Sequence, residues 1–326
     1  MQKPFIKIII LTFIIIQCSS NDKLTDEKVI KPIYRFKGEI SPFCFSNNNK
    51  FFAYYILNGN KSSVILRSLK TGRKIYKFDA DYIFRKGESK ETLRYCKNFY
   101  YRLKFSPDNK FLVCVAYSSH PCYLGYFRIW SVKTGKLILY KNADASIPSF
   151  YISTGSKLFA FSRHSFKESS IKIINILTGE IIYNLPNTGR QTTFSPNGKL
   201  LAFSTIKQKI KIMSAFNGKI LKTLEGHNSG IIELKFSPDS KYIVSSSLME
   251  NTTKIWKVQS IQKKPIYTLN NISNYNRAIK FLKSPLRVIF FNYPNIYFFS
   301  FKKKKIYTRL FLNQDDITVN SSIGVS

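Results

Sequence analysis

Side chains that could carry out catalysis or bind metal are sparse in this sequence. The chain has 326 residues but only three histidines, five cysteines and 18 acidic residues. It contains no nucleophile elbow, no His-Glu-x-x-His motif and no glycine-rich phosphate loop. His120 and Cys122 could act as base and nucleophile, but they fall in one short loop, where such closeness is usually accidental. We therefore predict a protein that is not an enzyme and needs no metal or cofactor.

Four cysteines lie in the body of the chain, an even number that would suit disulfides in an oxidising compartment. They are Cys44, Cys96, Cys114 and Cys122. If the chain turns after Phe105 and pairs back on itself from Lys110, Cys96 comes to lie near Ser119. That register allows a disulfide between Cys96 and Cys122. Cys44 and Cys114 are interpreted as buried free thiols, which behave as small apolar side chains.

The charge balance is strongly basic. The chain carries 52 Lys plus Arg and a formal net charge of +34, but only 12 of these residues are Arg. A positive field attracts polyanions, whereas bidentate recognition of phosphates and bases prefers the Arg fork, so nucleic acid is not expected as a partner. The densest basic run is Lys302, Lys303, Lys304 and Lys305. It falls at an expected hairpin turn, where it forms either a solvated tip or a contact with anionic lipid headgroups.

The N-terminus has the charge and hydropathy pattern of a secretory signal. Lys3 and Lys7 precede the apolar stretch 8–16, and the uncharged window between Lys7 and Asp22 holds 14 residues. A helix needs about 20 apolar residues to cross a bilayer. Residues 1–17 are therefore interpreted as a signal peptide, followed by a polar tether over residues 18–30.

Cys18 lies at the boundary between these two segments. The run Ile15-Ile16-Gln17-Cys18 resembles the bacterial lipoprotein box, although Gln17 replaces the usual small residue. The resemblance implies that the Cys18 thiol is acylated and becomes the new N-terminus, which would anchor the protein to a bacterial membrane facing the periplasm or the exterior. Two or more acyl chains are needed for lasting attachment. The alternative is an ordinary secretory signal with a chance cysteine.

The rest of the chain is built of repeats that must position any functional residue. The pattern Phe-Ser-Pro-Asp/Asn-x-Lys begins at Phe105, Phe194 and Phe236, and weaker copies begin at Phe45, Ile152 and Phe281. Most copies are 42 to 47 residues apart, and the first interval is longer because of an insertion over residues 79–96. A Gly turn between two apolar runs, as at Thr134-Gly135-Lys136, recurs in four units and predicts a hairpin. The sequence therefore contains six visible repeats.

Each repeat is expected to form four strands. In the unit that begins near Tyr101, apolar residues alternate up to Phe105, and strands are predicted over 111–117, 126–132 and 137–140. No stretch has a sustained helical period. The prediction is an all-β protein, a β-propeller of four-stranded antiparallel blades over residues 31–326. We favour seven blades, with Ile33–Phe36 and Ile317–Val325 completing one blade, and keep six blades as the alternative.

The unit from Leu224 to Val258 resembles a WD-repeat blade, with its Gly226-His227 pair and its late Trp256. The resemblance extends over residues 33–310 and is clear in only two units. It implies a structural tetrad of His227, a serine, Glu250 in place of the usual Asp, and Trp256. The serine is Ser245 or Ser247, and Ser247 is the one we choose. The run Ser195–Ser204 also resembles the six-bladed periplasmic propeller of the Tol system.

These features favour a monomeric, non-catalytic platform for protein interaction at a bacterial cell envelope, with an unidentified envelope protein as partner. Such a role is what the WD-repeat and lipoprotein resemblances imply, because the propeller supplies loops for contacts and no reaction. The alternative is a propeller that binds polyanions or anionic lipid through its positive charge. A hydrolase would need acidic or histidine side chains converging at the centre.

Overall fold

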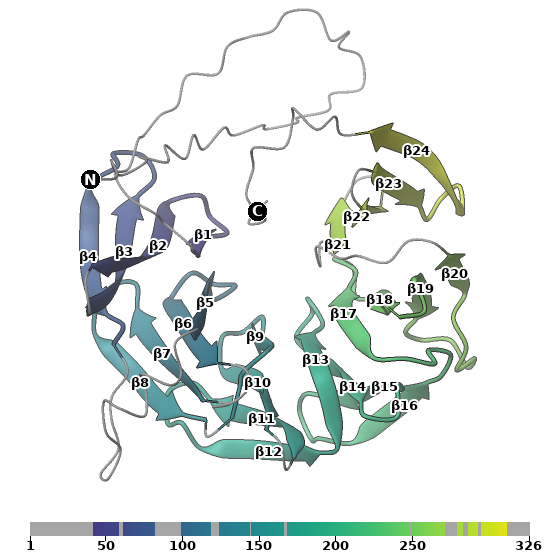
Figure 1. Cartoon of the computed structure of the whole chain (residues 1–326), viewed down its shortest axis with the longest axis horizontal. Helices are drawn as coiled ribbons and strands as arrows, with labels where there is room; N and C mark the ends of the chain where they lie inside the picture. Colours follow the sequence, from purple (N-terminus) through teal and green to yellow (C-terminus); the bar gives the residue numbers. More distant parts are fainter. Residues whose placement is uncertain are drawn as a thin grey trace, which may run out of the picture.

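The computed structural model describes residues 42–58, 61–81, 99–118, 124–143, 145–165, 168–247, 249–270, 279–282, 286–292 and 295–311. These residues form 24 strands in six four-stranded antiparallel sheets, and each sheet uses four consecutive strands of the chain. Figure 1 shows the sheets arranged around a common centre with the first strand of each innermost. The all-β propeller predicted from the sequence is therefore confirmed, with six blades in the described part of the chain.

The strands fall in blades of four. They are β1 Phe43–Phe45, β2 Phe51–Asn58, β3 Lys61–Ser68, β4 Lys74–Asp79; β5 Phe99–Phe105, β6 Phe111–Ser118, β7 Gly125–Ser131, β8 Leu137–Asn142; β9 Phe150–Ile152, β10 Leu158–His164, β11 Ser169–Asn175, β12 Ile181–Pro186; β13 Thr188–Phe194, β14 Leu200–Thr205, β15 Ile210–Ser214, β16 Ile220–Leu224; β17 Ile231–Phe236, β18 Tyr242–Ser247, β19 Thr252–Lys257, β20 Tyr267–Asn270; β21 Ile279–Leu282, β22 Arg287–Asn292, β23 Asn295–Ser300 and β24 Lys305–Phe311. The segments proposed to complete a seventh blade, 33–36 and 317–325, lie outside the described residues.

The Ser-Pro-Asp segment closes the first hairpin of a blade through side-chain hydrogen bonds. Between β5 and β6, Ser106 Oγ accepts a hydrogen bond from the Phe111 amide at 2.9 Å and donates one to Asp108 Oδ1 at 2.7 Å. Asn109 has φ of 61°, which asparagine tolerates better than most residues. Equivalent serines make the same pair of contacts in three other blades: Ser46, Ser195 and Ser237. The repeated serine is thus a turn-forming residue, which explains its recurrence in the sequence.

The Gly turn of one blade packs against a tyrosine of the preceding blade. Gly135, between β7 and β8, has φ of 70°, and a Cβ there would lie 2.7 Å from the Tyr76 ring of β4. The Tyr76 hydroxyl donates a hydrogen bond to the Lys133 carbonyl at 2.9 Å. Gly218 repeats this arrangement with Tyr183 of β12, at 2.6 Å. The Gly turns therefore serve two purposes, because they allow the left-handed backbone and leave room for the neighbouring ring.

Apolar side chains fill the spaces between adjacent sheets. One cluster joins the first blade to the second, for example where the Phe78 ring stacks on Trp130 with centroids 4.9 Å apart. Similar clusters join the second blade to the third, the third to the fourth, the fourth to the fifth and the fifth to the sixth. Because each sheet has apolar residues on both faces, a blade cannot bury its core without its neighbours.

We predict that Gly218→Ala lowers the free energy of unfolding by about 1–3 kcal/mol, because it combines a strained φ with a clash against the Tyr183 ring. Gly230→Ala is the matched control, since a Cβ at Gly230 would meet no atom within 4 Å and no positive φ is required there. Urea denaturation of both variants provides the measurement. Equal losses in the two variants would contradict this explanation of the Gly turns.

Candidate functional site

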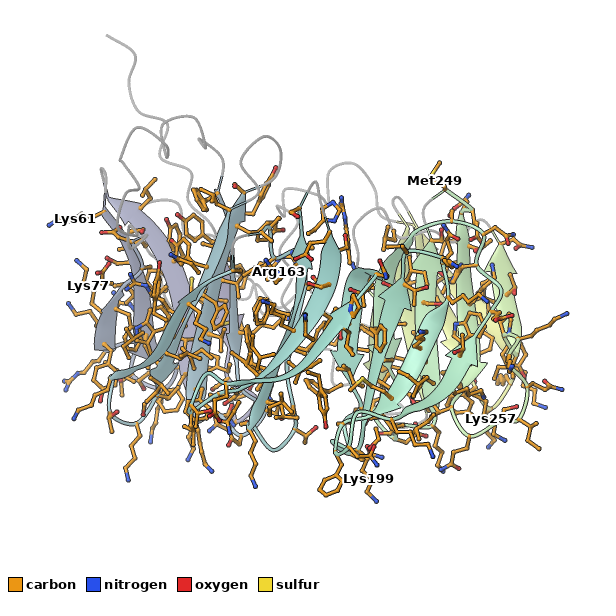
Figure 2. All side chains as sticks on the ribbon, turned by 90° about the horizontal axis from the view of Figure 1, so that it is seen from below. Lys61, Lys77, Arg163, Lys199, Met249 and Lys257 are labelled. Atoms are coloured by element: carbon orange, nitrogen blue, oxygen red, sulfur yellow. The ribbon has the colours of Figure 1, made fainter. Side chains whose placement is uncertain are left out.

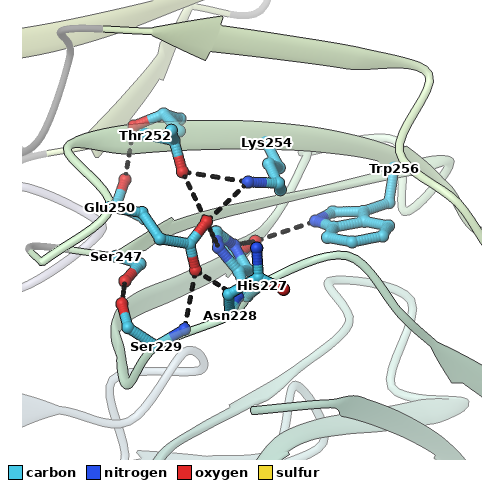
Figure 3. Close-up of polar contacts among 11 residues, drawn as sticks. His227, Asn228, Ser229, Ser247, Glu250, Thr252, Lys254 and Trp256 are labelled. Carbon is cyan, nitrogen blue, oxygen red and sulfur yellow. Dashed lines mark hydrogen bonds and ion pairs between the residues drawn. The ribbon is translucent and has the colours of Figure 1, made fainter.

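A chain of buried hydrogen bonds crosses the fifth blade and connects four segments of the chain (Figure 3). His227 lies in the connection between β16 and β17, and its Nε2 is 2.8 Å from Ser245 Oγ on β18. Trp256 on β19 donates its indole N–H to the same Ser245 oxygen at 2.8 Å. On the other side, His227 Nδ1 is 3.3 Å from Glu250 Oε2, in the turn between β18 and β19. The four side chains therefore form one continuous path.

The protonation of His227 follows from these partners. Burial, together with the positive charge of Lys254, lowers the pKa of His227 to about 4, so the ring is neutral at pH 7. A carboxylate can only accept, so Nδ1 carries the proton and donates it to Glu250. Nε2 then accepts from the Ser245 hydroxyl, whose oxygen accepts from Trp256. Every polar group in the path is satisfied only with this tautomer.

Glu250 links the turn between β18 and β19 to the connection between β16 and β17 through hydrogen bonds. Its Oε1 accepts a hydrogen bond from the Ser229 amide at 2.8 Å and another from the Asn228 amide. Its Oε2 accepts from Lys254 Nζ at 2.8 Å. Burial would raise the pKa of Glu250, but Lys254 and the two amides outweigh burial and lower the pKa to about 2. A glutamate therefore takes the place of the aspartate that the resemblance implied, and it remains ionised.

The structure corrects the choice of serine. Ser245, not Ser247, lies between His227 and Trp256, and Ser247 contacts the Ser229 hydroxyl instead. Both serines project from the same face of β18, because residues two apart share a face. Ser247 is at the end of the strand, opposite the connection, whereas the imidazole reaches two residues deeper to Ser245. Spacing in the sequence could not decide between two serines on one face.

Lys254 is a member of this network that the sequence analysis did not identify. It is buried on β19, and its ammonium pairs with Glu250 at 2.8 Å and with Thr252 Oγ1 at 3.0 Å. The alternation of Thr252, Lys254 and Trp256 places all three on one face of the strand. That alternation was the available signal, but a lysine in a basic chain does not stand out as a buried residue.

The remaining predicted site residues lie outside this blade. Cys18, Cys96 and Cys122 are not among the described residues, so the acylation and the disulfide remain predictions. Phe105 pairs with Leu112, two residues beyond the expected position. Cys44 and Cys114 are free thiols, and burial raises the pKa of Cys114 to about 12, so its thiolate is scarce at neutral pH. Within the described residues, no three His, Cys, Asp or Glu side chains form a metal-binding group.

Cations gather on one face of the propeller. In antiparallel blades, the turn after each first strand and the turn after each third strand lie at the same end, which we call the lower face after Figure 2, where Lys199 and Lys257 mark it. The exposed cations in or beside these turns include Lys50, Lys70, Arg73, Lys110, Lys133, Lys136, Lys157, Lys199, Lys219, Lys241, Lys257, Lys302, Lys303 and Lys304. The acidic residues of the same turns are Asp108, Glu180 and Asp239. Lys305 begins β24 beside the last turn.

Carboxylates that pair with cations occur mostly at the opposite end. Glu168 pairs with Arg163 at 2.8 Å and Glu225 with Lys209 at 2.7 Å, both next to turns at the end marked by Met249 in Figure 2. Glu250, paired with Lys254, lies in such a turn as well. The described part of the chain is therefore polarised, with a strongly basic lower face and a more balanced upper face.

Comparison with known proteins agrees with this geometry. The family model "WD40: WD domain, G-beta repeat" matches residues 218–257, which include the network of the fifth blade. The C-terminal WD40 domain of Sif2 superposes with a TM-score of 0.63 at 14% identity, covering 84% of this chain and 73% of that domain. The chain contains a WD40 repeat and has the fold of a WD40 propeller. The sequence resemblance is confirmed at the level of fold and repeat.

Curated relatives match only parts of the chain. WD repeat-containing protein 82 of Drosophila melanogaster is 40% identical over 73 residues, which are 22% of this chain and 23% of that protein. A bromodomain and WD repeat-containing protein of Dictyostelium discoideum is 25% identical over 147 residues, 44% of this chain and 7% of that protein. The chain thus spans less than a quarter of the length of either relative. In the described residues, no helix is long and apolar enough to cross a membrane.

We predict that Ser245→Ala destabilises the propeller more than Ser247→Ala. Removing the Ser245 hydroxyl leaves the buried Trp256 N–H and His227 Nε2 without their partner, at a cost of about 1–3 kcal/mol. Ser247→Ala removes only the contact with Ser229. Urea midpoints of the two variants measure the difference, and a larger loss for Ser247→Ala would show that the path is wrongly assigned.

The network also predicts how stability depends on pH. The pKa of His227 is about 4 in the folded protein and 6.5 ordinarily, so the unfolded chain binds the extra proton and stability falls as pH drops from 6.5 to 4. Glu250, with its pKa lowered from 4.5 to about 2, adds a further loss below pH 4.5. We expect the histidine to contribute up to about 3 kcal/mol between pH 7 and 4.

Urea unfolding of the native protein and of His227→Gln at pH 7, 5.5 and 4 measures this contribution. The variant is less stable at pH 7, but its stability declines less between pH 7 and 4. Parallel pH profiles for the two proteins would contradict the assignment of a neutral, buried His227.

Proposed function

We propose that this chain is a non-catalytic propeller that binds an envelope protein at a bacterial cell envelope, as a monomer held to the membrane by lipid on Cys18. The observation that carries the proposal is the WD40 propeller itself, because such domains generally act as scaffolds for protein interaction. The resemblance of the N-terminus to a lipoprotein signal supplies the location. The resemblance to the Tol-system propeller supports the same compartment.

The architecture suits a docking role. Apolar clusters between successive sheets hold the blades in a fixed relation, so the connections at the ends of the strands are displayed on a stiff frame. Connections of different length follow the outer strands: a single residue, Asn187, separates β12 from β13, whereas residues 225–230 separate β16 from β17. Binding residues on rigid scaffolds are usually carried by such segments.

We predict that Cys18→Ser releases the protein from membranes without abolishing recognition of its partner. Mild crosslinking in intact envelopes, followed by affinity capture, would recover the same partner with both forms, while fractionation and labelling with an acyl-chain analogue would detect the anchor only in the native form. Membrane fractionation that persists in Cys18→Ser with no acyl label in either form would overturn the lipid anchor. Capture of no specific protein by either form would overturn the docking role.

The lower face supports a second candidate function, binding to anionic lipid headgroups. Its exposed cations greatly outnumber its acidic residues, and Phe216 (92% exposed) and Leu177 (66% exposed) project from Gly turns on the same face. Basic residues at a membrane surface contribute about 1 kcal/mol each, and apolar side chains between them can enter the interface. This arrangement matches a membrane surface better than a base-reading site, which would need Arg.

We predict that, in the Cys18→Ser protein, replacing Lys302, Lys303 and Lys304 by Gln weakens binding to vesicles of phosphatidylglycerol and phosphatidylcholine by roughly tenfold to a hundredfold. Replacing Lys61, Lys77 and Lys207 by Gln is the matched control, because the same charge is removed from positions away from the lower face. Vesicle sedimentation at two salt concentrations gives the affinities. Equal weakening by both triple variants would show that total charge, not the lower face, determines binding.

A further inference from the structure

A pocket of about 260 Å³ lies at the centre of the propeller, among residues that the proposed function does not use. Its lining comes from the innermost strands of four consecutive blades or from the segments that lead into them: Arg102, Lys104, Ser149, Phe150, Tyr151, Gln191, Glu233 and Lys235. In Figure 1 these strands, β5, β9, β13 and β17, all face the common centre. We call this space the central pocket.

The repeat register explains why cations meet there. Lys104 and Lys235 occupy the same position in their blades, immediately before the anchor residues Phe105 and Phe236. Lys280 is their equivalent in the sixth blade. Repeated units place equivalent residues at equivalent distances from the axis, so lysines at this one position are brought together by the fold although they are far apart in sequence.

The positive charge of the pocket is only partly neutralised. Arg102 donates a hydrogen bond to the Pro148 carbonyl at 2.8 Å, and Lys104 donates to the Phe150 carbonyl at 3.3 Å. Carbonyl groups carry no net charge, and within the described residues neither cation pairs with a carboxylate. Lys235 is the exception, since its Nζ is 2.9 Å from Glu233 Oε1. Among the described residues of the lining, three cations and one carboxylate leave two uncompensated positive charges.

The pKa values of Lys104 and Lys280 are lowered, which agrees with an excess of positive charge in the central pocket. Lys104 is reached by solvent within the pocket but is surrounded by protein, and this burial, with the nearby Arg102 and Lys235, lowers its pKa to about 8. Burial, and then Lys235, likewise lower the pKa of Lys280 to about 8. Like charges held close together repel one another and favour a bound counter-charge.

We propose that the central pocket binds a doubly charged oxyanion, a phosphate group that is either free or carried on a small molecule. The Arg102 guanidinium offers a fork of N–H donors, and Lys104 and Lys235 offer ammonium groups, the donor types that bind phosphate oxygens most strongly. Gln191 and Ser149 add neutral polar groups to the lining. A dianion matches the two uncompensated charges, and the small volume of the pocket suits a small molecule and not a polymer.

The central pocket differs from the lower face in what it would recognise. The lower face is broad and exposed, and its cations are almost all Lys. Its interaction with anions is therefore expected to be diffuse and sensitive to salt. In the central pocket, donors from several blades converge on one small volume, so binding is expected to be selective for charge and size. Loss of the lower-face lysines should leave phosphate binding in the pocket intact.

The test is isothermal titration of the Cys18→Ser protein with inorganic phosphate and, separately, with glycerol phosphate, using chloride as the monovalent control. Binding of phosphate near 1 mM or tighter is expected for such a site. Lys104→Met should weaken it by about tenfold or more, whereas Lys199→Met, an exposed lysine on the lower face, should not change it. Tighter binding of glycerol phosphate than of phosphate would identify the ligand as a small organic phosphate, and the reverse would identify free phosphate.

One further variant and one further measurement separate binding from folding. Glu233→Gln should tighten phosphate binding several-fold, because it removes the one described carboxylate of the lining. Lys104→Met should raise the melting temperature without phosphate, since it relieves repulsion between the lysines, and should reduce the stabilisation that phosphate gives the native protein. Absence of binding up to 10 mM, or equal binding by native protein and Lys104→Met, would overturn the proposal, as would weaker binding by Glu233→Gln.

Discussion

Each four-stranded sheet of this protein has apolar side chains on both faces, and only the neighbouring sheets can cover them. Five apolar clusters in the described residues each combine residues of two successive blades, as when Phe78 of one blade stacks on Trp130 of the next. A sixth cluster lies within the first blade. Burial of apolar surface is the dominant favourable term in folding. The repeats therefore cannot fold one by one, and every site in the molecule depends on this mutual burial.

Two sets of polar groups lie at positions that the apolar contacts between blades do not occupy. The path through His227, Ser245 and Trp256 crosses the interior of one blade and is fully paired, so it strengthens the frame without offering a reactive group. At the centre of the propeller the innermost strands meet at a small polar volume, and the repeat register brings Lys104 and Lys235 to that volume. The propeller thus contains a fully paired hydrogen-bond network in the fifth blade and an excess of positive charge in the central pocket.

Much of the fold could be predicted from the sequence because its turns depend on residues that are close together in the chain. The Ser-Pro-Asp and Gly turns depend on contacts within a few residues, as the bonds of Ser106 show, so their positions and the strand type followed from spacing. The His227, Glu250 and Trp256 members of the network were readable as well, through the resemblance. Ser245 was not separable from Ser247, because two serines on one face of a strand have the same pattern and only depth decides between them.

The central pocket could not be read from the sequence for a different reason. Arg102 and Glu233 are more than a hundred residues apart and meet only when the blades are arranged around one axis. Lysine precedes three of the six anchors, as Lys104, Lys235 and Lys280, and is inconspicuous there in a chain with a net charge of +34. Likewise, the burial of Lys254 was indicated only by its alternation with Thr252 and Trp256, which is a weak signal in a basic chain. Long-range placement of charge, unlike turn chemistry, is a property of the assembled fold.

Native-state hydrogen exchange tests the mutual dependence of the blades most directly. Amides in the second strands of successive blades, β6, β10, β14 and β18, would be followed as denaturant is raised from zero. If neighbouring sheets must cover one another, these amides converge on one opening free energy equal to that of global unfolding. Separate opening free energies for each sheet, with one blade exchanging while its neighbours stay protected, would contradict this account.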